Sequence, residues 1–124
     1  MSTSGAPRIS KNDAEAIRCT EQLIEAMQNL RRFLEVREET LRRALLANEP
    51  ASDFSVALKD AQVTEHREDL NEALFALERC RRESRIASFR SALDHGVSIS
   101  ELSRIWGFSR QMASRYAKEA REDC

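Results

Sequence analysis

Hydrophobic residues in the first half of the chain recur at intervals of three, four and seven positions. These intervals place the residues on one face of a helix. Ser10 or Asn12 can cap this helix, and the pattern continues until Pro50, which lacks a backbone donor and disfavours helix in the residue before it. The sequence therefore predicts one long helix that begins near residue 10. Its apolar stripe consists of Leu23, Met27, Leu30, Leu34, Leu41, Ala44 and Leu45.

A second helical pattern follows Pro50, with Ser52 or Asp53 as its cap. It is irregular at first, weakest over residues 62–64 where a kink would be easiest, and then becomes a regular heptad run. Gly96 ends it, because glycine readily adopts the left-handed conformation that closes many helices. Two long helices joined by a short proline-bearing turn predict an antiparallel helical hairpin similar to a coiled coil. The heptad run consists of Leu70, Ala73, Leu74, Leu77, Cys80, Ser84 and Ala87.

The apolar face of the first predicted helix is wider than one seam requires, because Ile17, Ile24 and Phe33 extend it. A single hairpin buries one seam, so part of this face would remain in water. We therefore expect a second copy of the chain to cover it, giving a homodimer built by residues 10–95. The alternative is that the extra apolar residues cover the C-terminal segment of the same chain. The expected dimerisation residues are Leu23, Met27, Leu30, Leu34 and Leu41.

Residues 97–121 contain closely spaced helix start and stop signals. Ser98 and Glu101 are spaced as a capping box, in which the serine accepts a hydrogen bond from the amide three residues later. A short helix follows and ends at Gly107, and Ser109 caps the next helix. The residues predicted to face inward are Leu102, Ile105 and Trp106 in the first helix and Met112, Ala113 and Tyr116 in the second.

Charge is distributed unevenly along the chain. Residues 79–121 contain ten Arg or Lys against four Asp or Glu, a net charge of +6. Residues 1–78 contain ten against fifteen, a net charge of −5, and with Glu122 and Asp123 the overall charge becomes −1, which conceals the difference. A basic end on an acidic chain favours contact between that end and a polyanion.

The same segment resembles the helix-turn-helix of bacterial DNA-binding regulators, transposases and site-specific recombinases. Ser-Ile-Ser-Glu-Leu-Ser matches the first helix, Gly107 the turn, and Phe-Ser-Arg-Gln-Met-Ala-Ser-Arg-Tyr the start of the recognition helix. Residues 86–93 match the supporting helix, and the N-terminal two thirds of the chain show no such resemblance. Ser103 and Ala113 depart from the pattern, since alanine and a branched residue are commonest at their respective positions.

The resemblance implies that the second helix enters the major groove of duplex DNA. Its first turns reach base edges, where arginine recognises guanine and glutamine recognises adenine, and its later turns approach the phosphates. The expected base-facing residues are Arg110, Gln111, Ser114 and Arg115, and the expected backbone contacts are Ser109, Lys118 and Arg121. The arginines that could extend this basic surface from the preceding helix are Arg79, Arg81, Arg82, Arg85 and Arg90.

Other features of the sequence limit the remaining function classes. No stretch approaches the roughly 20 apolar residues that span a bilayer, and residues 1–9, an expected flexible tail, lack an apolar signal region. The three cysteines are too widely spaced for a disulfide framework or a metal motif, and His66 and His95 lack metal-ligand neighbours. We therefore expect a reduced, cytoplasmic, nucleoid-associated protein without metal or cofactor.

The sequence contains no glycine-rich phosphate loop, nucleophile motif or catalytic carboxylate pair, so we do not expect an enzyme. The predicted fold is all-α, with a hairpin over residues 10–95 and a helix-turn-helix over residues 96–124 whose supporting helix starts near residue 82. The predicted function is sequence-specific binding of double-stranded DNA by a dimeric bacterial or mobile-element transcriptional regulator. The alternatives are an adaptor whose hairpin binds a partner protein, and a plasmid partition or nucleoid protein.

Overall fold

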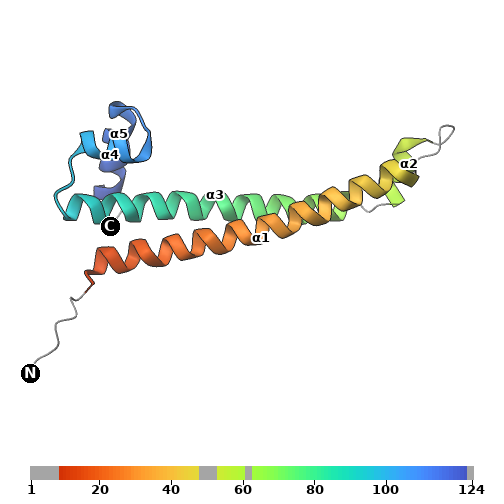
Figure 1. The fold of residues 1–124 in the computed structure, drawn as a ribbon, viewed down its shortest axis with the longest axis horizontal. Coiled ribbons are helices and arrows are strands. Elements are labelled where there is room, and N and C mark those ends of the chain that lie inside the picture. The colour runs from red at the N-terminus through yellow and green to blue at the C-terminus, as the bar shows by residue number, and fades with distance from the viewer. Residues whose placement is uncertain (1–8, 48–52, 61–62, 123–124) are drawn as a thin grey trace, which may run out of the picture. The chain divides into compact units, whose positions relative to one another are not determined.

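The computed structural model describes residues 9–47, 53–60 and 63–122, and within these ranges the chain forms five helices and no strand. The predicted all-α class is therefore confirmed, and two of the helices are long (Figure 1). No helix in the described ranges is both long and apolar enough to cross a membrane. The helices are α1 (Lys11–Ala47), α2 (Phe54–Asp60), α3 (Val63–Asp94), α4 (Ile99–Trp106) and α5 (Arg110–Glu122).

Helix α1 begins where the sequence predicts it. The amide of Asp13 donates to Ser10 Oγ at 3.1 Å, so Ser10 rather than Asn12 caps the helix. The helix extends over 37 residues to Ala47. The predicted stop at Pro50 lies outside the described residues.

Where the sequence predicts one second helix, the structure describes α2 and α3, and residues 61–62 between them, which include the start of the predicted weak stretch, lie outside the described residues. Asp53 starts α2, since its Oδ1 accepts a hydrogen bond from the amide of Ser55 at 2.9 Å; Ser52 lies outside the described residues. α3 ends as predicted at Gly96, which has a φ of 82°. The amides of Gly96 and Val97 donate to the carbonyls of Leu93 and Ala92, each at 3.0 Å, a pattern that satisfies the last carbonyls of the helix.

The described chain forms two compact units, which we call the terminal unit (residues 1–22 and 80–124) and the central unit (residues 23–79). In the terminal unit the start of α1 and the end of α3 run antiparallel. Asp13 is hydrogen-bonded to Ser91, whereas further along α1 Thr20 Oγ1 lies 3.4 Å from the Oγ of Ser84, which comes earlier in α3. The two helices therefore pass each other in opposite directions with a heptad between these contacts.

Phe89 of α3 is the centre of the terminal unit's core and is completely buried. Its ring centroid lies 5.4 Å from that of Trp106 and 6.0 Å from that of Tyr116, the second in an edge-on arrangement. α4 contributes Leu102, which is 1% exposed, and α5 contributes three alanines that are 0% exposed. Because alanine has a small side chain, α5 can approach this core closely. The alanines are Ala113, Ala117 and Ala120.

Of the six residues predicted to face inward in this unit, three are buried or half-buried and three are exposed to different extents. Tyr116 is half-buried, and Trp106, although 37% exposed, stacks on Phe108 with ring centroids 5.8 Å apart. Met112 is also 37% exposed. The prediction for Ile105 is wrong, since it is 70% exposed. A helix of only eight residues has one narrow inner face, which Leu102 and Trp106 occupy, and Ile105 lies beside that face.

In the central unit the predicted leucine stripe of α1 separates into two neighbouring faces. Leu23 and Leu30 are half-buried and share a heptad spacing with the buried Ala44. Met27, Leu34 and Leu41 are 46%, 47% and 37% exposed. Half-buried and buried residues of α3 also follow a heptad spacing, which is typical of one intramolecular seam per helix; they are His66, Leu70, Ala73 and Leu77. The homodimer itself stays a prediction.

Candidate nucleic-acid interface

The turn between α4 and α5 is fixed by local hydrogen bonds. Ser98 has an extended backbone, and its Oγ accepts from the amide of Glu101 at 3.1 Å, as the predicted capping box requires. Gly107 ends α4 with a φ of 72°, a left-handed conformation that most residues with a Cβ avoid. Beside it, the Ser103 hydroxyl donates to the carbonyl of Phe108 at 2.6 Å, and the amide of Phe108 donates to the carbonyl of Ser103 at 3.1 Å.

Ser109 caps α5 as predicted, since its Oγ accepts from the amide of Met112 at 3.1 Å. The helix that follows has two distinct faces. Its inner face consists of the fully buried alanines, and its outer face is polar and basic. All seven residues predicted to contact DNA are exposed and lie on this outer face, at or after the cap. They are Ser109, Arg110, Gln111, Ser114, Arg115, Lys118 and Arg121.

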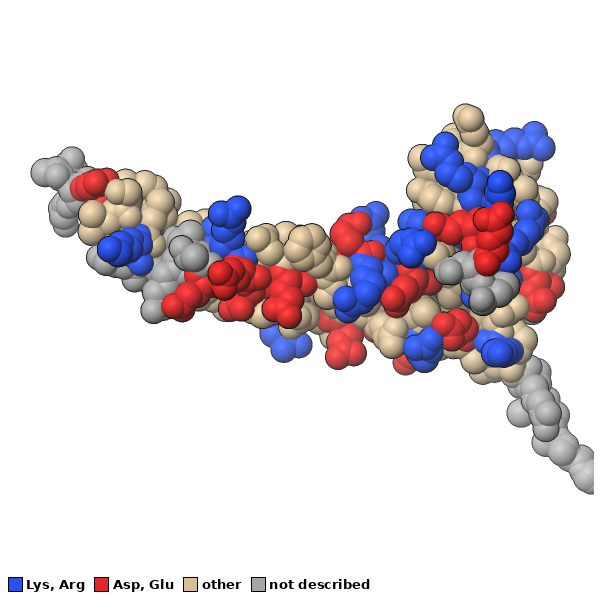
Figure 2. All heavy atoms as spheres, turned by 180° about the vertical axis from the view of Figure 1, so that it is seen from behind, with Lys and Arg blue, Asp and Glu red and all other residues tan. Residues whose placement is uncertain are grey.

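Acidic residues also lie on α5, but one of them is already paired within the protein. Glu119 is half-buried, and its carboxylate oxygens lie 3.3 Å from the guanidinium of Arg82 and 3.2 Å from that of Arg85. Arg115 and Lys118 border a shallow hollow beside it. Figure 2 shows Lys and Arg side chains over the surface of α4 and α5, with a smaller group of acidic side chains among them. The ion pairs offset the charge of Glu119, whereas the exposed Glu122 borders the same hollow and reduces the basic charge at that end of the outer face.

Three arginines of α3 contact α5, and one of them, Arg82, also borders the same hollow as Arg115 and Lys118. Arg85 stacks over the ring of Tyr116 at 4.0 Å from the centroid and also binds Glu119. Its Nε is buried and has no hydrogen-bond partner among the described residues. Arg90 donates from its Nε to the carbonyl of Ala120 at 3.0 Å, which satisfies one of the last carbonyls of α5. With Arg82, these side chains fix the position of α5 on α3.

The sequence analysis did not identify this anchoring role. Glu119 is the only acidic residue between Leu102 and Arg121, and a single acid within a basic helix is a usable indication of an internal ion pair. Which arginines it pairs with depends on the packing of α5 against α3, and that packing connects residues more than 30 positions apart.

A second polar cluster joins the start of α1 to the end of α3. The Asp13 carboxylate accepts a hydrogen bond from the Ser91 hydroxyl. Its Oδ2 lies 2.8 Å from Nε2 of His95. The bond from Ser91, followed by the bond from His95, lowers the pKa of Asp13 below its ordinary value of 3.8. The bond to Asp13 and its negative charge raise the pKa of His95 above its ordinary value of 6.5. The cluster therefore favours the ionised Asp13 together with the protonated His95.

The stability of the terminal unit is therefore expected to depend on pH through His95. Because its pKa is raised by folding, the contribution of His95 is complete below pH 6.5 and is lost as the pH rises through the raised pKa. The contribution of Asp13 is present above pH 3.8 and is lost as the pH falls through its lowered pKa. The melting temperature of the wild type should fall as the pH rises above 6.5 and through the raised pKa of His95. In His95→Asn this fall should be smaller, and an equal fall in both proteins would contradict the assignment.

Ser98 provides a test of the local geometry of α4. Ser98→Ala removes the side-chain oxygen that accepts from the amide of Glu101 and should lower the free energy of unfolding by about 0.5–2 kcal/mol. Chemical denaturation measures this change. We expect DNA affinity to fall only as far as stability does. A loss of affinity at unchanged stability would instead indicate that Ser98 contacts DNA directly.

The cysteines do not form a reactive site in the described part of the chain. Cys19 is 3% exposed, and this burial, followed by the charge of Glu15, raises the pKa of its thiol. Cys80 is a half-buried free cysteine, and Cys124 lies outside the described residues. Among the residues described, no group of three or more His, Cys, Asp or Glu is placed to hold a metal ion.

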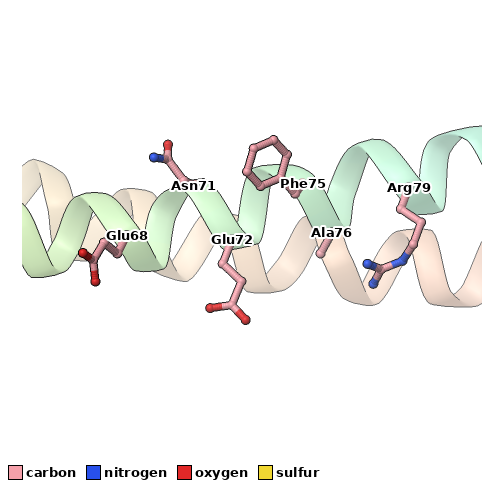
Figure 3. Close-up of a pocket in the computed structure, with 6 residues that line it drawn as sticks. All are labelled: Glu68, Asn71, Glu72, Phe75, Ala76 and Arg79. Carbon is pink, nitrogen blue, oxygen red and sulfur yellow. The ribbon is translucent and has the colours of Figure 1, made fainter.

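The central unit contains one surface feature that the sequence analysis missed. Phe75 of α3 is 72% exposed and borders a shallow hollow. Figure 3 shows the ring of Phe75 and the amide of Asn71 along one edge of this hollow, with Glu68, Glu72 and Arg79 along the other. Phe75 falls outside the heptad run that the sequence predicts for this helix.

Comparisons of the chain with protein-family models, with curated proteins and with solved structures find no match. A functional assignment therefore depends on the geometry of α4 and α5 and on the chemistry of their exposed side chains.

Proposed function

We propose that α4, the turn at Gly107 and α5 form a helix-turn-helix that binds double-stranded DNA in a sequence-specific manner. The observation that supports this most strongly is the division of α5 into two faces. Three alanines on one face are 0% exposed, and every residue expected to contact DNA is exposed on the other. A helix fixed along its inner face and bearing donors along its outer face suits insertion into a major groove.

The order of residues along α5 matches the order of contacts that groove insertion requires. Arg110 and Gln111 lie in the first turn, from which side chains reach base edges. Arginine donates two hydrogen bonds to guanine, and glutamine makes a bidentate pair with adenine. Lys118 and Arg121 lie two or more turns later, where the helix leaves the groove and approaches phosphates. Ser109 adds a hydroxyl at the helix N-terminus, next to a positive dipole.

The anchoring of α5 to α3 supports specific rather than general binding. Base reading requires side chains held in a defined geometry, and a rigid supporting element provides it. Arg85 and Arg90 contact the ring of Tyr116 and the backbone of α5, and Glu119 adds two ion pairs. A scaffold without this support would present the same charges without a fixed register.

The proposed biological role is that of a dimeric transcriptional regulator of a bacterium or a mobile element, located at the nucleoid. Two recognition helices related by two-fold symmetry read two half-sites, which increases both affinity and specificity. A plasmid partition protein or a nucleoid protein would use the same dimer and the same recognition helices. One observation favours an adaptor instead: Phe75 is 72% exposed on the central unit, as a contact for a partner protein would be.

Selection from a random duplex pool tests the proposed function. The wild-type protein is incubated with the pool, and the bound duplexes are recovered, amplified and sequenced over several rounds. We expect enrichment of one motif, with two related half-sites. The affinity for this motif should fall steeply as salt is raised, because phosphate contacts release counterions. Recovery of an unenriched pool, or no recovery of DNA at low salt, would contradict the proposal.

A further inference from the structure

The exposed face of α1 in the central unit has an ordered pattern. Five large apolar residues on this face are between 37% and 64% exposed. They alternate with two oppositely charged residues, Arg31 and Glu38, at spacings of three and four residues. These spacings place all seven residues in one stripe, which lies beside the half-buried seam of Leu23 and Leu30. The apolar members are Ile24, Met27, Leu34, Leu41 and Leu45.

This stripe is self-complementary about its centre. Leu34 lies at the middle, with Met27 and Leu41 seven residues to either side. Arg31 lies three residues before Leu34 and Glu38 four residues after it, and Ile24 and Leu45 lie ten and eleven residues away, so these two pairs match to within one residue. Reversing the direction of the helix therefore exchanges apolar positions with apolar positions and the basic position with the acidic one.

We infer that this face of α1 binds the same face of a second copy of the chain, with the two α1 helices antiparallel. A two-fold axis at Leu34 brings Met27 against Leu41 of the partner subunit. It also brings Arg31 to within one residue, about 1.5 Å along the helix, of Glu38 of the partner subunit, a distance that these long side chains can span, and symmetry repeats each contact. The inference deepens the dimer of the proposed function and does not depend on DNA binding.

The charges specify the direction of the pairing. A parallel dimer would place Arg31 against Arg31 of the partner subunit and Glu38 against its own equivalent, so that like charges meet twice. The antiparallel arrangement replaces both repulsions with attractions, and such charges determine orientation in coiled coils. In the structure Glu38 is held at the surface by Arg42 of the same helix at 2.6 Å, in an exposed contact that is weak in water.

The apolar content of the stripe identifies its occupant as a second copy rather than water or a charged peptide. The stripe continues over the 22 residues from Ile24 to Leu45, about 30 Å of helix, with five large apolar side chains. An antiparallel partner of the same sequence supplies an equal number at matching positions. A partner of unrelated sequence would have to reproduce both the apolar spacing and the reversed order of the two charges.

Charge exchange at two positions tests the inference. Arg31→Glu alone and Glu38→Arg alone each create two repulsive contacts and should weaken the dimer about tenfold or more, as measured by sedimentation equilibrium of the full chain. The double variant, Arg31→Glu with Glu38→Arg, restores both attractions and should dimerise within about threefold of wild type. An equimolar mixture of the two single variants should form heterodimers for the same reason.

Matched variants one position further along control for charge itself. Arg32→Glu and Glu39→Arg have the same spacing and exposure but lie outside the stripe. Each should leave the dimer constant within about threefold of wild type, and helical content measured by circular dichroism should be unchanged in every variant. Glu39→Arg removes exposed ion pairs with Arg43 and Arg42, whereas Glu38→Arg removes one with Arg42, so the control variant loses at least as many ion pairs within α1 as the test variant does.

The inference would be overturned by a wild type that is monomeric at micromolar concentration, or by single variants that dimerise as the wild type does. It would also be overturned if the double variant dimerised as weakly as the single variants. A dimer that Phe75→Ser dissociates and the stripe variants do not affect would have the same consequence. Selection of one DNA motif by a monomeric wild type would overturn this dimer while leaving the DNA-binding proposal intact. A dimer of wild-type strength that selects no DNA motif would support this interface and contradict the DNA-binding proposal.

Discussion

Phe89→Ala lowers the free energy of unfolding of the terminal unit by about 3–5 kcal/mol, which is the largest loss expected from any single substitution in this chain. The side chain is 0% exposed and contacts three aromatic rings, those of Trp106, Phe108 and Tyr116. Removing it leaves a cavity between α3, α4 and α5 that small alanines cannot fill. Urea denaturation followed by tryptophan fluorescence measures the loss, because Trp106 lies in this cluster.

Phe75→Ala is the matched control for this substitution. It removes the same side chain from the same helix, but Phe75 is 72% exposed and should contribute less than about 0.5 kcal/mol to the stability of the monomer. Equal losses in the two variants would show that Phe89 is not the centre of a packed core. DNA binding should be abolished by Phe89→Ala and unchanged by Phe75→Ala.

The double variant Arg110→Ala with Gln111→Ala loses sequence-specific binding while the protein stays folded. Each bidentate contact with a base contributes about 1–3 kcal/mol of discrimination, and both side chains are exposed in the first turn of α5. Fluorescence anisotropy with the selected duplex and with a shuffled one measures the change. The affinity for the two duplexes should become equal.

Lys118→Ala separates charge attraction from base reading. Lys118 is also exposed on the outer face, but two turns later. Its removal should weaken binding to both duplexes by a similar factor and reduce the dependence of affinity on salt by about one ion. If the Arg110 and Gln111 double variant distinguishes the two duplexes as the wild type does, α5 is not the recognition helix. The adaptor would then be the better account of the chain.

Local sequence signals predicted the boundaries of the elements well. The caps at Ser10, Ser98 and Ser109 each act over three residues, and a serine oxygen accepts an amide in every case. Gly96 and Gly107 have positive φ at the ends of α3 and α4, where the sequence predicts helix termination. Interactions of this range are determined by adjacent residues, so they are legible without knowledge of the tertiary fold.

The features that the sequence did not reveal depend on how helices pack. The stripe of α1 appeared as one wide face, whereas the structure places Leu30 in a half-buried seam and leaves Leu34 47% exposed. Helical periodicity cannot divide a wide apolar face between a partner helix of the same chain and a second surface. Ile105 illustrates the same limit on a shorter scale, since an apolar residue near the inner face of α4 is exposed by the direction of the neighbouring helices.

The exposed residues of the candidate site could be predicted from the sequence, but the contacts that hold α5 against α3 could not. Periodicity alone identified the exposed residues of α5, because a residue's position on a helix follows from its number. The ion pairs of Glu119 and the stacking of Arg85 on Tyr116 join α3 and α5 across more than 30 residues. Contacts of that separation follow from the fold and not from any local pattern.

The most direct test of the DNA-binding proposal is a nuclear magnetic resonance titration of the isotope-labelled protein with the selected duplex. We expect the amide shifts to change most at residues 109–121, with smaller changes at the start of α4. The central unit, including the residues around Phe75, should show no change on addition of DNA. Changes concentrated around Phe75, or binding without any change along α5, would contradict the assignment of α5 as the helix that reads DNA.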